Sequence, residues 1–76
     1  MSQCYYCGGE QEEQIVTFVY EDAGQVWIIR NVPAFVCKQC GEREYRQKVT
    51  HRLLTLLRQP PRPAEIVPVP AYEFAT

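Results

Sequence analysis

The residues of this chain whose type and spacing point to chemistry are its cysteines. All four occur in pairs, with two residues between the members and a glycine directly after: Cys4, Cys7, Cys37 and Cys40. Two intervening residues let both sulfurs of a pair converge on one ion, and the glycine permits the left-handed backbone that brings amides close to the sulfurs. Four thiolates make a closed tetrahedral site of the structural zinc kind. We therefore predict one structural Zn²⁺ ion held by these four residues.

Three other uses of paired cysteines fit the sequence less well. A thioredoxin-like pair occurs once, at a helix start in a βαβ unit, whereas this chain carries two pairs without such a unit. A disulfide framework requires export, and nothing in the sequence indicates export. A rubredoxin-like iron electron carrier also joins two such knuckles through short strands. It often has a proline after the first cysteine and has no use for a basic helix, so iron stays an alternative to zinc.

The sequence shows no arrangement typical of an enzyme. With sulfur at every coordination position there is no open place for water, so metal-assisted hydrolysis is not expected. His51 is the only histidine, and it lies on the predicted polar face of a helix, away from both cysteine pairs. Phosphate-cradling loops of the Walker or dinucleotide type are absent. We predict a protein without catalytic activity.

The short length of the chain predicts a stabilising metal ion, and its charge pattern predicts a surface that can contact a partner. A core built from 76 residues supplies little net stability, so an additional cross-link such as a bound metal ion is expected. The net charge is −4 over residues 1–37 and +5 over residues 38–62. A basic middle of this kind can contact an acidic partner or nucleic acid, although a solvated helix face is the simpler interpretation. The contact candidates are Arg43, Arg46, Lys48, His51, Arg52 and Arg58.

The cellular location is predicted from targeting signals. Residues 1–9 lack the basic and apolar regions of a signal or transit peptide. No apolar run approaches the roughly 20 residues that a membrane helix needs, so no membrane association is expected. We predict a cytoplasmic protein, in a compartment where thiols stay reduced and structural disulfides are uncommon.

Between the cysteine pairs the sequence predicts strands. Two apolar runs, 15–20 and 26–32, are rich in β-branched and aromatic residues. Residues 21–25 separate them, with aspartate early and glycine late, as a hairpin loop requires. A third short strand over 34–36 is expected after a turn at Pro33. The prediction is a small α+β fold with an antiparallel β-hairpin or three-stranded sheet, zinc-ribbon-like, followed by a C-terminal helix.

The apolar spacing changes to a helical period from about residue 44 to residue 59. At about 100° per residue, the apolar side chains fall on one side of an amphipathic helix, with Leu54 at the margin: Tyr45, Val49, Leu53, Leu56 and Leu57. The basic side chains and His51 gather on the opposite side. The apolar stripe has to be buried, either on the sheet or on another chain, and burial in the core is the expected case.

Prolines end the helix and begin a different kind of segment. From residue 60 onward they lack amide donors and collide with a preceding helical turn. We therefore divide the chain into a zinc-binding domain, 1–59, and a Pro-rich extended tail, 60–76. The tail is too apolar for a solvated linker, so we interpret it as a docking segment with Tyr72 and Phe74 as contacts. It can instead pack on its own domain, or exchange with a second copy to form a homodimer.

The order of these motifs resembles the YgiT-type zinc finger family, represented by the N-terminal zinc-binding domain of MqsA antitoxins. The matching features are CxxCGG at residues 4–9, a hairpin ending in IIRNVPA at 28–34, VCKQCGE at 36–42, and a helix after it. The resemblance covers roughly residues 1–58. Its most specific part is the string VPA-x-VCxxCGE.

The resemblance implies a function. Members of the family look like zinc-stabilised modules that bind and neutralise a small toxin, often an RNA-cleaving one, in a type II toxin-antitoxin system. By that analogy the four cysteines are the zinc ligands and the partner is a cognate toxin. No helix-turn-helix domain follows the zinc-binding region, so direct DNA binding and autoregulation are not expected. The alternatives are a nucleic-acid-binding zinc ribbon and the iron electron carrier.

Overall fold

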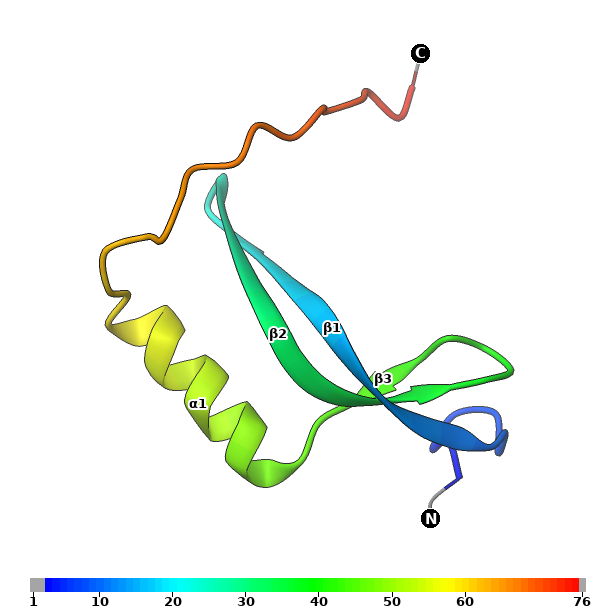
Figure 1. The fold of residues 1–76 in the computed structure, drawn as a ribbon. Coiled ribbons are helices and arrows are strands. Elements are labelled where there is room, and N and C mark those ends of the chain that lie inside the picture. The colour runs from blue at the N-terminus through cyan, green and yellow to red at the C-terminus, as the bar shows by residue number, and fades with distance from the viewer. Residues whose placement is uncertain (1–2, 76) are drawn as a thin grey trace.

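The computed structural model describes residues 3–75 and contains one antiparallel sheet and one helix (Figure 1). The elements are, in chain order, β1 (Gln11–Asp22), β2 (Gln25–Cys37), β3 (Arg43–Glu44) and α1 (Gln47–Arg58). The three strands pair in the order β1-β2-β3. The predicted three-stranded antiparallel sheet with one following helix is therefore confirmed. Over residues 3–75, no helix is long and apolar enough to cross a membrane.

The two long strands join in a tighter turn than the sequence predicts. Ala23 and Gly24 have φ angles of 53° and 82°, the left-handed backbone that a two-residue hairpin turn requires. Asp22 and Gln25, on either side of the turn, are already paired with each other. The predicted loop over 21–25 is too long, because two residues with positive φ are enough to reverse the chain.

A β-bulge interrupts the pairing of β1 with β2. Val16 lies opposite Val32 and Phe18 lies opposite Ile29, so β2 has one residue more than β1 between these pairs. Asn31 lies in that interval with a φ of 61°, and asparagine tolerates the left-handed conformation better than most side chains. The bulge therefore places Ile29 and Val32 on the same side of the sheet.

Pro33 does not end a strand, which corrects the predicted turn and the predicted strand over 34–36. β2 runs through it to Cys37, whose amide donates to the Glu42 carbonyl at 2.9 Å, away from β1. Position 33 faces the same edge of β2, because residues an even number of positions apart share an edge. β3 covers that edge only opposite Phe35 and Val36. Proline is tolerated at an uncovered edge, since no donor is needed there.

The third strand forms where the apolar spacing predicts the first turn of the helix. Arg43 and Glu44 pair with β2, and Arg46 is still extended, with φ −63° and ψ 156°. α1 consequently begins at Gln47 rather than near residue 44. The backbone groups of Arg43 and Glu44 are already used by the sheet, so they are not available to a helix.

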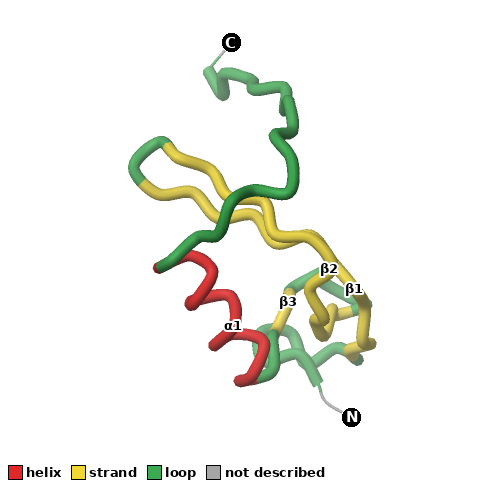
Figure 2. The backbone as a smooth tube through the Cα atoms, turned by 60° about the vertical axis from the view of Figure 1, so that its left-hand side comes forward, coloured by secondary structure: helices red, strands yellow, loops and turns green. Residues whose placement is uncertain are grey.

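The apolar stripe of α1 packs against β2, as predicted. Leu53 is 5% exposed and Val32 is 4% exposed, and the ring of Phe18 meets that of Tyr45 edge to face, with centroids 5.8 Å apart. Figures 1 and 2 show the helix beside β2. Leu54, expected at the margin of the stripe, is 40% exposed. The core is therefore a thin layer between one helix and one face of the sheet.

The tail leaves the domain beside the tip of the hairpin. Residues 59–75 form no helix or strand. Arg30 of β2 donates to a Glu65 carboxylate oxygen at 2.9 Å. After this ion pair the chain runs past the hairpin turn and away from the sheet (Figure 1).

Candidate metal centre

The first cysteine pair is held in a tight loop by its own backbone. The Cys4 amide donates to the Gly9 carbonyl at 2.7 Å, and the Gly8 amide donates to the Cys4 carbonyl at 2.9 Å. Gly8 has a φ of 76°, a conformation that a side chain would strain. Local hydrogen bonds therefore turn the sulfurs of Cys4 and Cys7 toward the same point.

The second cysteine pair repeats this backbone. The Cys37 amide donates to the Glu42 carbonyl at 2.9 Å, and the Gly41 amide donates to the Cys37 carbonyl at 3.0 Å. Gly41 has a φ of 81°. The left-handed backbone predicted for the glycine after each pair is present in both loops, which have the same hydrogen-bond pattern.

The hairpin brings the two loops together although they are far apart in the sequence. β1 starts at Gln11, directly after the first loop, and β2 ends at Cys37 in the second loop. These two residues are register partners. The Lys38 amide donates to the Glu10 carbonyl at 2.9 Å and extends the pairing beyond β2. The register of the hairpin therefore determines which residues of the two loops face each other.

The four sulfur atoms form one cluster. The Sγ atoms of Cys4 and Cys40 are 3.7 Å apart, and those of Cys7 and Cys37 are 3.4 Å apart. All four lie within 4.8 Å of one another. A tetrahedral ion with metal–sulfur bonds of about 2.3 Å places its sulfurs about 3.8 Å apart. The predicted ligands are thus brought together in an arrangement that can hold one metal ion.

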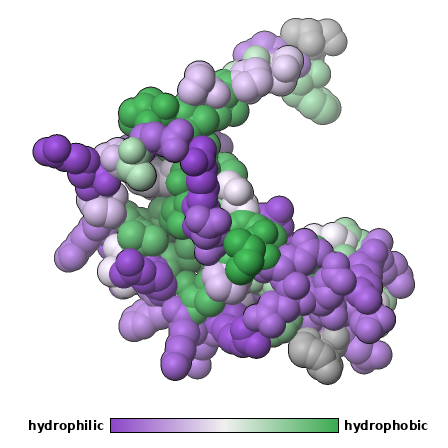
Figure 3. Space-filling view, in the orientation of Figure 1, coloured by the Kyte–Doolittle hydropathy of each residue, from purple (hydrophilic) through white to green (hydrophobic). Residues whose placement is uncertain are grey.

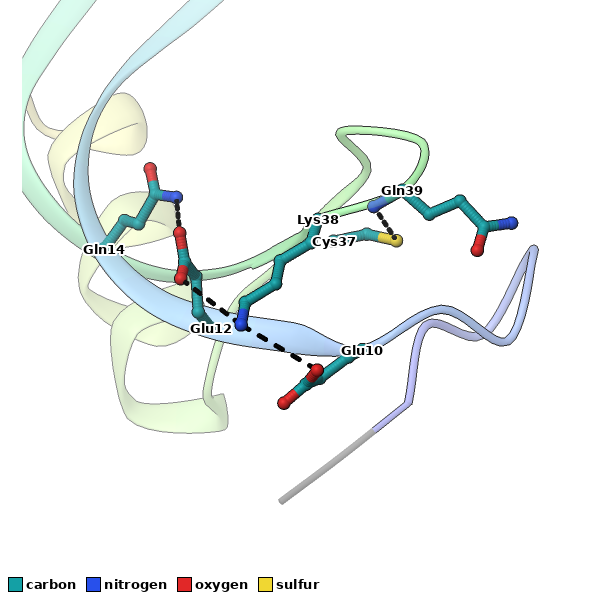
Figure 4. A network of polar contacts seen from close by, with 6 residues as sticks. All are labelled: Glu10, Glu12, Gln14, Cys37, Lys38 and Gln39. Carbon is teal, nitrogen blue, oxygen red and sulfur yellow. Dashed lines mark hydrogen bonds and ion pairs between the residues drawn. The ribbon is translucent and has the colours of Figure 1, made fainter.

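Backbone amides favour the thiolate form of Cys37. Its sulfur accepts from the Cys40 amide at 3.4 Å and from the Gln39 amide at 3.3 Å, the latter drawn in Figure 4. The Cys40 amide has the largest influence, and with the Gln39 amide it lowers the pKa of Cys37 to about 6. Cys37 is therefore anionic at neutral pH and suited to binding a cation.

The neighbouring sulfurs oppose further ionisation. The Glu42 amide favours the thiolate of Cys40, but the Cys7 sulfur and burial outweigh it and raise the pKa of Cys40 to about 12. The Gly9 amide likewise favours the thiolate of Cys7, and the Cys37 sulfur together with burial outweighs it, so the pKa of Cys7 is raised. Thiolates this close repel one another unless a cation lies between them. The donor set therefore fits a divalent ion that prefers sulfur ligands.

Gly9 supports the centre in a way that the cysteine spacing does not predict. A Cβ at this position would lie 2.8 Å from the Cβ of Gln39, 3.0 Å from the Sγ of Cys37 and 3.3 Å from the Sγ of Cys7. The Gly9 amide also donates to the Cys7 sulfur at 3.4 Å. The second loop crosses directly over Gly9, so a side chain has no space there. The doubled glycine of CxxCGG is the sequence signal that points to this position.

Charged side chains beside the centre pair with one another. Lys38 Nζ lies 3.8 Å from a Glu10 oxygen and 3.9 Å from a Glu12 oxygen. Gln14 Nε2 donates to Glu12 at 2.7 Å, and Figure 4 shows these side chains along β1. Exposed contacts of this kind contribute at most about 1 kcal/mol each. The backbone of the loops, rather than these charges, positions the sulfurs.

Two of the predicted contact arginines have partners inside the molecule. Arg43 donates to the Thr17 carbonyl at 2.9 Å. Arg46 donates to a Glu13 carboxylate oxygen at 2.7 Å, and its guanidinium lies 4.6 Å from the centroid of the Phe35 ring. These contacts connect the residues before α1 to β1 and β2. Both arginines therefore have a structural role that the charge pattern does not indicate.

The other predicted contact residues are exposed and lie apart from the sulfurs. Four of them are on α1: Lys48, His51, Arg52 and Arg58. In the tail, Tyr72 is 87% exposed and Phe74 is fully exposed. The structure thus brings the four predicted ligands together and leaves the predicted partner contacts on α1 and the tail.

Comparisons with known proteins identify no relative of this chain. No family model, no curated protein and no solved structure matches it. The resemblance to the YgiT-type family stays a prediction from the motifs, so the function has to be argued from the site and the exposed surfaces.

Proposed function

We propose that the cysteine cluster binds one structural zinc ion. Zinc takes four thiolates in tetrahedral geometry, and ligand sets made only of sulfur favour zinc or iron over hard cations. Cys4, Cys7, Cys37 and Cys40 fill every position of such a site, so neither water nor a substrate has a place on the ion. When bound, the ion supplies a cross-link between two distant loops. A catalytic role has no support in this arrangement.

Metal analysis and an absorption spectrum of the purified protein test this assignment. We expect one equivalent of zinc per chain and a colourless solution. The Cys40→Ser variant should hold less than one equivalent, because one ligand is lost. A coloured protein that contains iron would contradict the assignment and support the electron-carrier alternative.

We propose further that the protein binds and neutralises a small partner toxin of a type II toxin-antitoxin pair, RNA-cleaving by the family resemblance. The observation that carries this proposal is the separation of the cysteine cluster from the exposed surfaces. Among residues 3–75, the side chains of Lys48, Arg52 and Arg58 take part in no ion pair. A protein whose cysteines all serve as ligands of a structural ion is expected to act through surfaces of this kind.

The exposed face of α1 is the surface that the proposal assigns to the toxin. A shallow hollow there is lined by Gln47, Lys48, Thr50, His51 and Leu54. Leu54 is 40% exposed and places an apolar side chain among these polar residues. An apolar side chain on a helix face that carries Lys48, Arg52 and Arg58 is complementary to an acidic protein surface with an apolar centre.

Co-expression with the open reading frame adjacent to its gene tests the proposal. The chain should co-purify with that protein and relieve the growth arrest that it causes. Reversing two charges, Lys48→Glu with Arg52→Glu, should weaken the complex by about tenfold or more. Arg62→Glu changes an exposed cation outside α1 and should have little effect. Failure of the unmodified chain to form the complex or relieve the arrest would contradict the proposal.

A nucleic-acid-binding zinc ribbon is the second candidate, because the cations of α1 have no partners within the described chain. Arg43 and Arg46 no longer belong to this surface, since both bind inside the molecule. Three remaining phosphate contacts, from Lys48, Arg52 and Arg58, predict an affinity for single-stranded RNA with a log–log salt slope of about −2. Absence of binding at low salt would eliminate this candidate.

A further inference from the structure

The molecule exposes more surface than a compact chain of its mass. Its accessible surface is 6587 Å², whereas a compact monomer of 8.9 kDa exposes about 4,800 Å². Its radius of gyration is 14.6 Å, against about 11.4 Å for a compact domain of this length. A standard protein interface buries about 800 Å² on each partner. The excess surface is therefore large enough for a stable dimer interface.

Part of this surface is an apolar patch on the hairpin, which we call the hairpin face. It consists of four β-branched residues with exposed fractions of 64%, 60%, 55% and 36%: Ile15, Val19, Val26 and Ile28. Val19 lies opposite Ile28, and Val26 lies opposite Glu21 on the strand that carries Val19. Since side chains two positions apart share a face, all four lie on the side opposite Phe18, which packs on Tyr45. α1 therefore leaves this face uncovered.

No strand of the described chain covers the outer edge of β1, where the Thr17 carbonyl accepts a side-chain hydrogen bond from Arg43. β1 is at the end of the sheet order, so its outer edge has no strand partner in the described chain. The strand extends over 12 residues without proline, and Ile15 and Val19 of the hairpin face lie on it. A long, exposed and apolar edge strand is a template for the addition of another strand.

The tail has the properties of the strand that such an edge accepts. Its apolar side chains are exposed, with fractions of 84% for Ile66, 63% for Val69 and 87% for Tyr72. Pro68 and Pro70 are two positions apart, so in an extended chain both lie on the same edge. The other edge keeps its amide donors and can pair, while the proline edge cannot accept a further strand. Addition of the tail would therefore cap the sheet and end its growth.

We propose that two copies of the chain form a closed dimer in which the tail of each copy adds to the outer edge of β1 in the other copy. Its apolar side chains then become cross-strand neighbours of Ile15 and Val19. In the described chain the tail contacts β2 through the Glu65–Arg30 ion pair and then runs past the hairpin turn and away from the sheet. The exchange is reciprocal, so both tails and both β1 edges are occupied and the assembly closes at two chains.

This proposal does not depend on the metal's identity or on a toxin partner, because the dimer uses the hairpin and the tail. The exposed face of α1 stays free for the toxin. Of the predicted partner contacts, the proposal assigns Tyr72 and Phe74 to the second copy. Loss of the dimer and loss of toxin binding can therefore be measured separately.

Sedimentation velocity of the metal-loaded full chain measures the assembly state. We expect a species of twice the chain mass that dissociates on dilution. A monomer at all accessible concentrations would overturn the proposal. Larger open-ended assemblies would overturn it as well, because reciprocal exchange leaves no free tail and no free β1 edge in the dimer.

A matched pair of substitutions tests where the second copy binds. Val19→Lys places a cation on the edge strand and should raise the dimer Kd by about 30-fold or more. Val26→Lys places the same cation on the same face but on β2, and it should change the Kd by no more than about twofold. Unchanged metal content and circular dichroism establish that both variants fold. Equal increases in the dimer Kd for the two variants would contradict the proposal and show that the copies meet through their hairpin faces rather than through the outer edges of β1.

A photo-crosslinker identifies the chain that the tail contacts. With p-benzoylphenylalanine in place of Tyr72, illumination should yield a covalent dimer on a denaturing gel, joined to residues of β1. A crosslinked monomer would show that the tail packs on its own chain. Absence of any crosslink would show that the tail is undocked, and either result would overturn the exchange.

Discussion

The two ends of the β1–β2 hairpin are held in different ways. At the metal end, backbone hydrogen bonds shape both cysteine loops, and the Tyr5 amide donates to Glu44 of β3 at 3.2 Å. At the other end, Ala23 and Gly24 form a two-residue turn and Val26 beside it is 55% exposed. Figure 3 shows mainly hydrophilic residues over the metal end and apolar residues along the tail where it passes the hairpin.

This difference separates the region that the proposed metal would stabilise from the region that we propose for binding. Within residues 3–75, five apolar residues are buried, and two of them, Cys4 and Cys37, belong to the sulfur cluster. A metal ion at that end can replace the core that so short a chain cannot build. The apolar side chains at the other end are then available for binding. The predictions below test this division, from the largest expected effect to the smallest.

Removing the metal should have the largest effect. Cys37→Ser removes one ligand and the acceptor of two amides. We expect most of the stabilisation that zinc supplies in small domains, about 10–16 kcal/mol, to be lost, together with the strand signal. Circular dichroism and amide chemical-shift dispersion measure this loss. Zinc added after chelation should restore the fold of the unmodified chain but not that of the variant. A variant that melts at the same temperature as the unmodified chain would contradict the stabilising role of the metal.

Acid should release the metal, because protons compete with it for the thiolates. The pKa of Cys37 is lowered to about 6, so this sulfur is a thiolate above that pH and needs no deprotonation there. Below about pH 6 it must lose a proton to bind. The fall in log affinity should therefore steepen by about one unit per pH unit below pH 6. Competition with a chromophoric chelator measures the slope, and an unchanged slope across pH 6 would contradict the assigned pKa.

Two glycine substitutions compare the ends of the hairpin directly. Gly9→Ala places a methyl group 3.0 Å from the Cys37 sulfur and should weaken metal binding by about 10- to 100-fold, as changes beside metal ligands do. Gly24→Ala meets no atom within 4 Å but has a φ of 82°, so it should cost about 1–2 kcal/mol of folding stability and leave metal affinity unchanged. Equal metal affinities in the two variants would show that the ends are not independent.

Two exposed ion pairs should give the smallest effects. Arg46 binds Glu13 at 2.7 Å and also lies over the Phe35 ring, whereas Arg30 binds Glu65 at 2.9 Å without a ring contact. Arg46→Ala should lower the free energy of unfolding by about 1 kcal/mol. Arg30→Ala should lower it by less than about 0.5 kcal/mol. Chemical denaturation measures both, and equal losses would show that the ring contact contributes nothing.

Local patterns predicted the elements better than their connections. The helical period identified the buried side of α1, because a stripe of leucines has to face the sheet whatever surrounds it. The turn at Pro33 was wrong, since whether proline breaks a strand depends on which edge its nitrogen faces. The start of the helix was also wrong, because β2 pairs with Arg43 and Glu44. Both errors occur at positions where pairing with a strand that is distant in the sequence determines the local backbone conformation.

The sequence by itself determined the chemistry of this protein. Two cysteine pairs, each followed by glycine, specify four thiolates and the left-handed backbone that turns them inward, because these are properties of residue type and short-range spacing. Tertiary structure decided the rest. The strands carry apolar residues on both faces, as Ile15 and Val16 show, so only the docking of α1 determines which face is buried and which is exposed. Likewise, only the register of the hairpin places Gly9 beneath the second loop and brings the four sulfurs within reach of one ion.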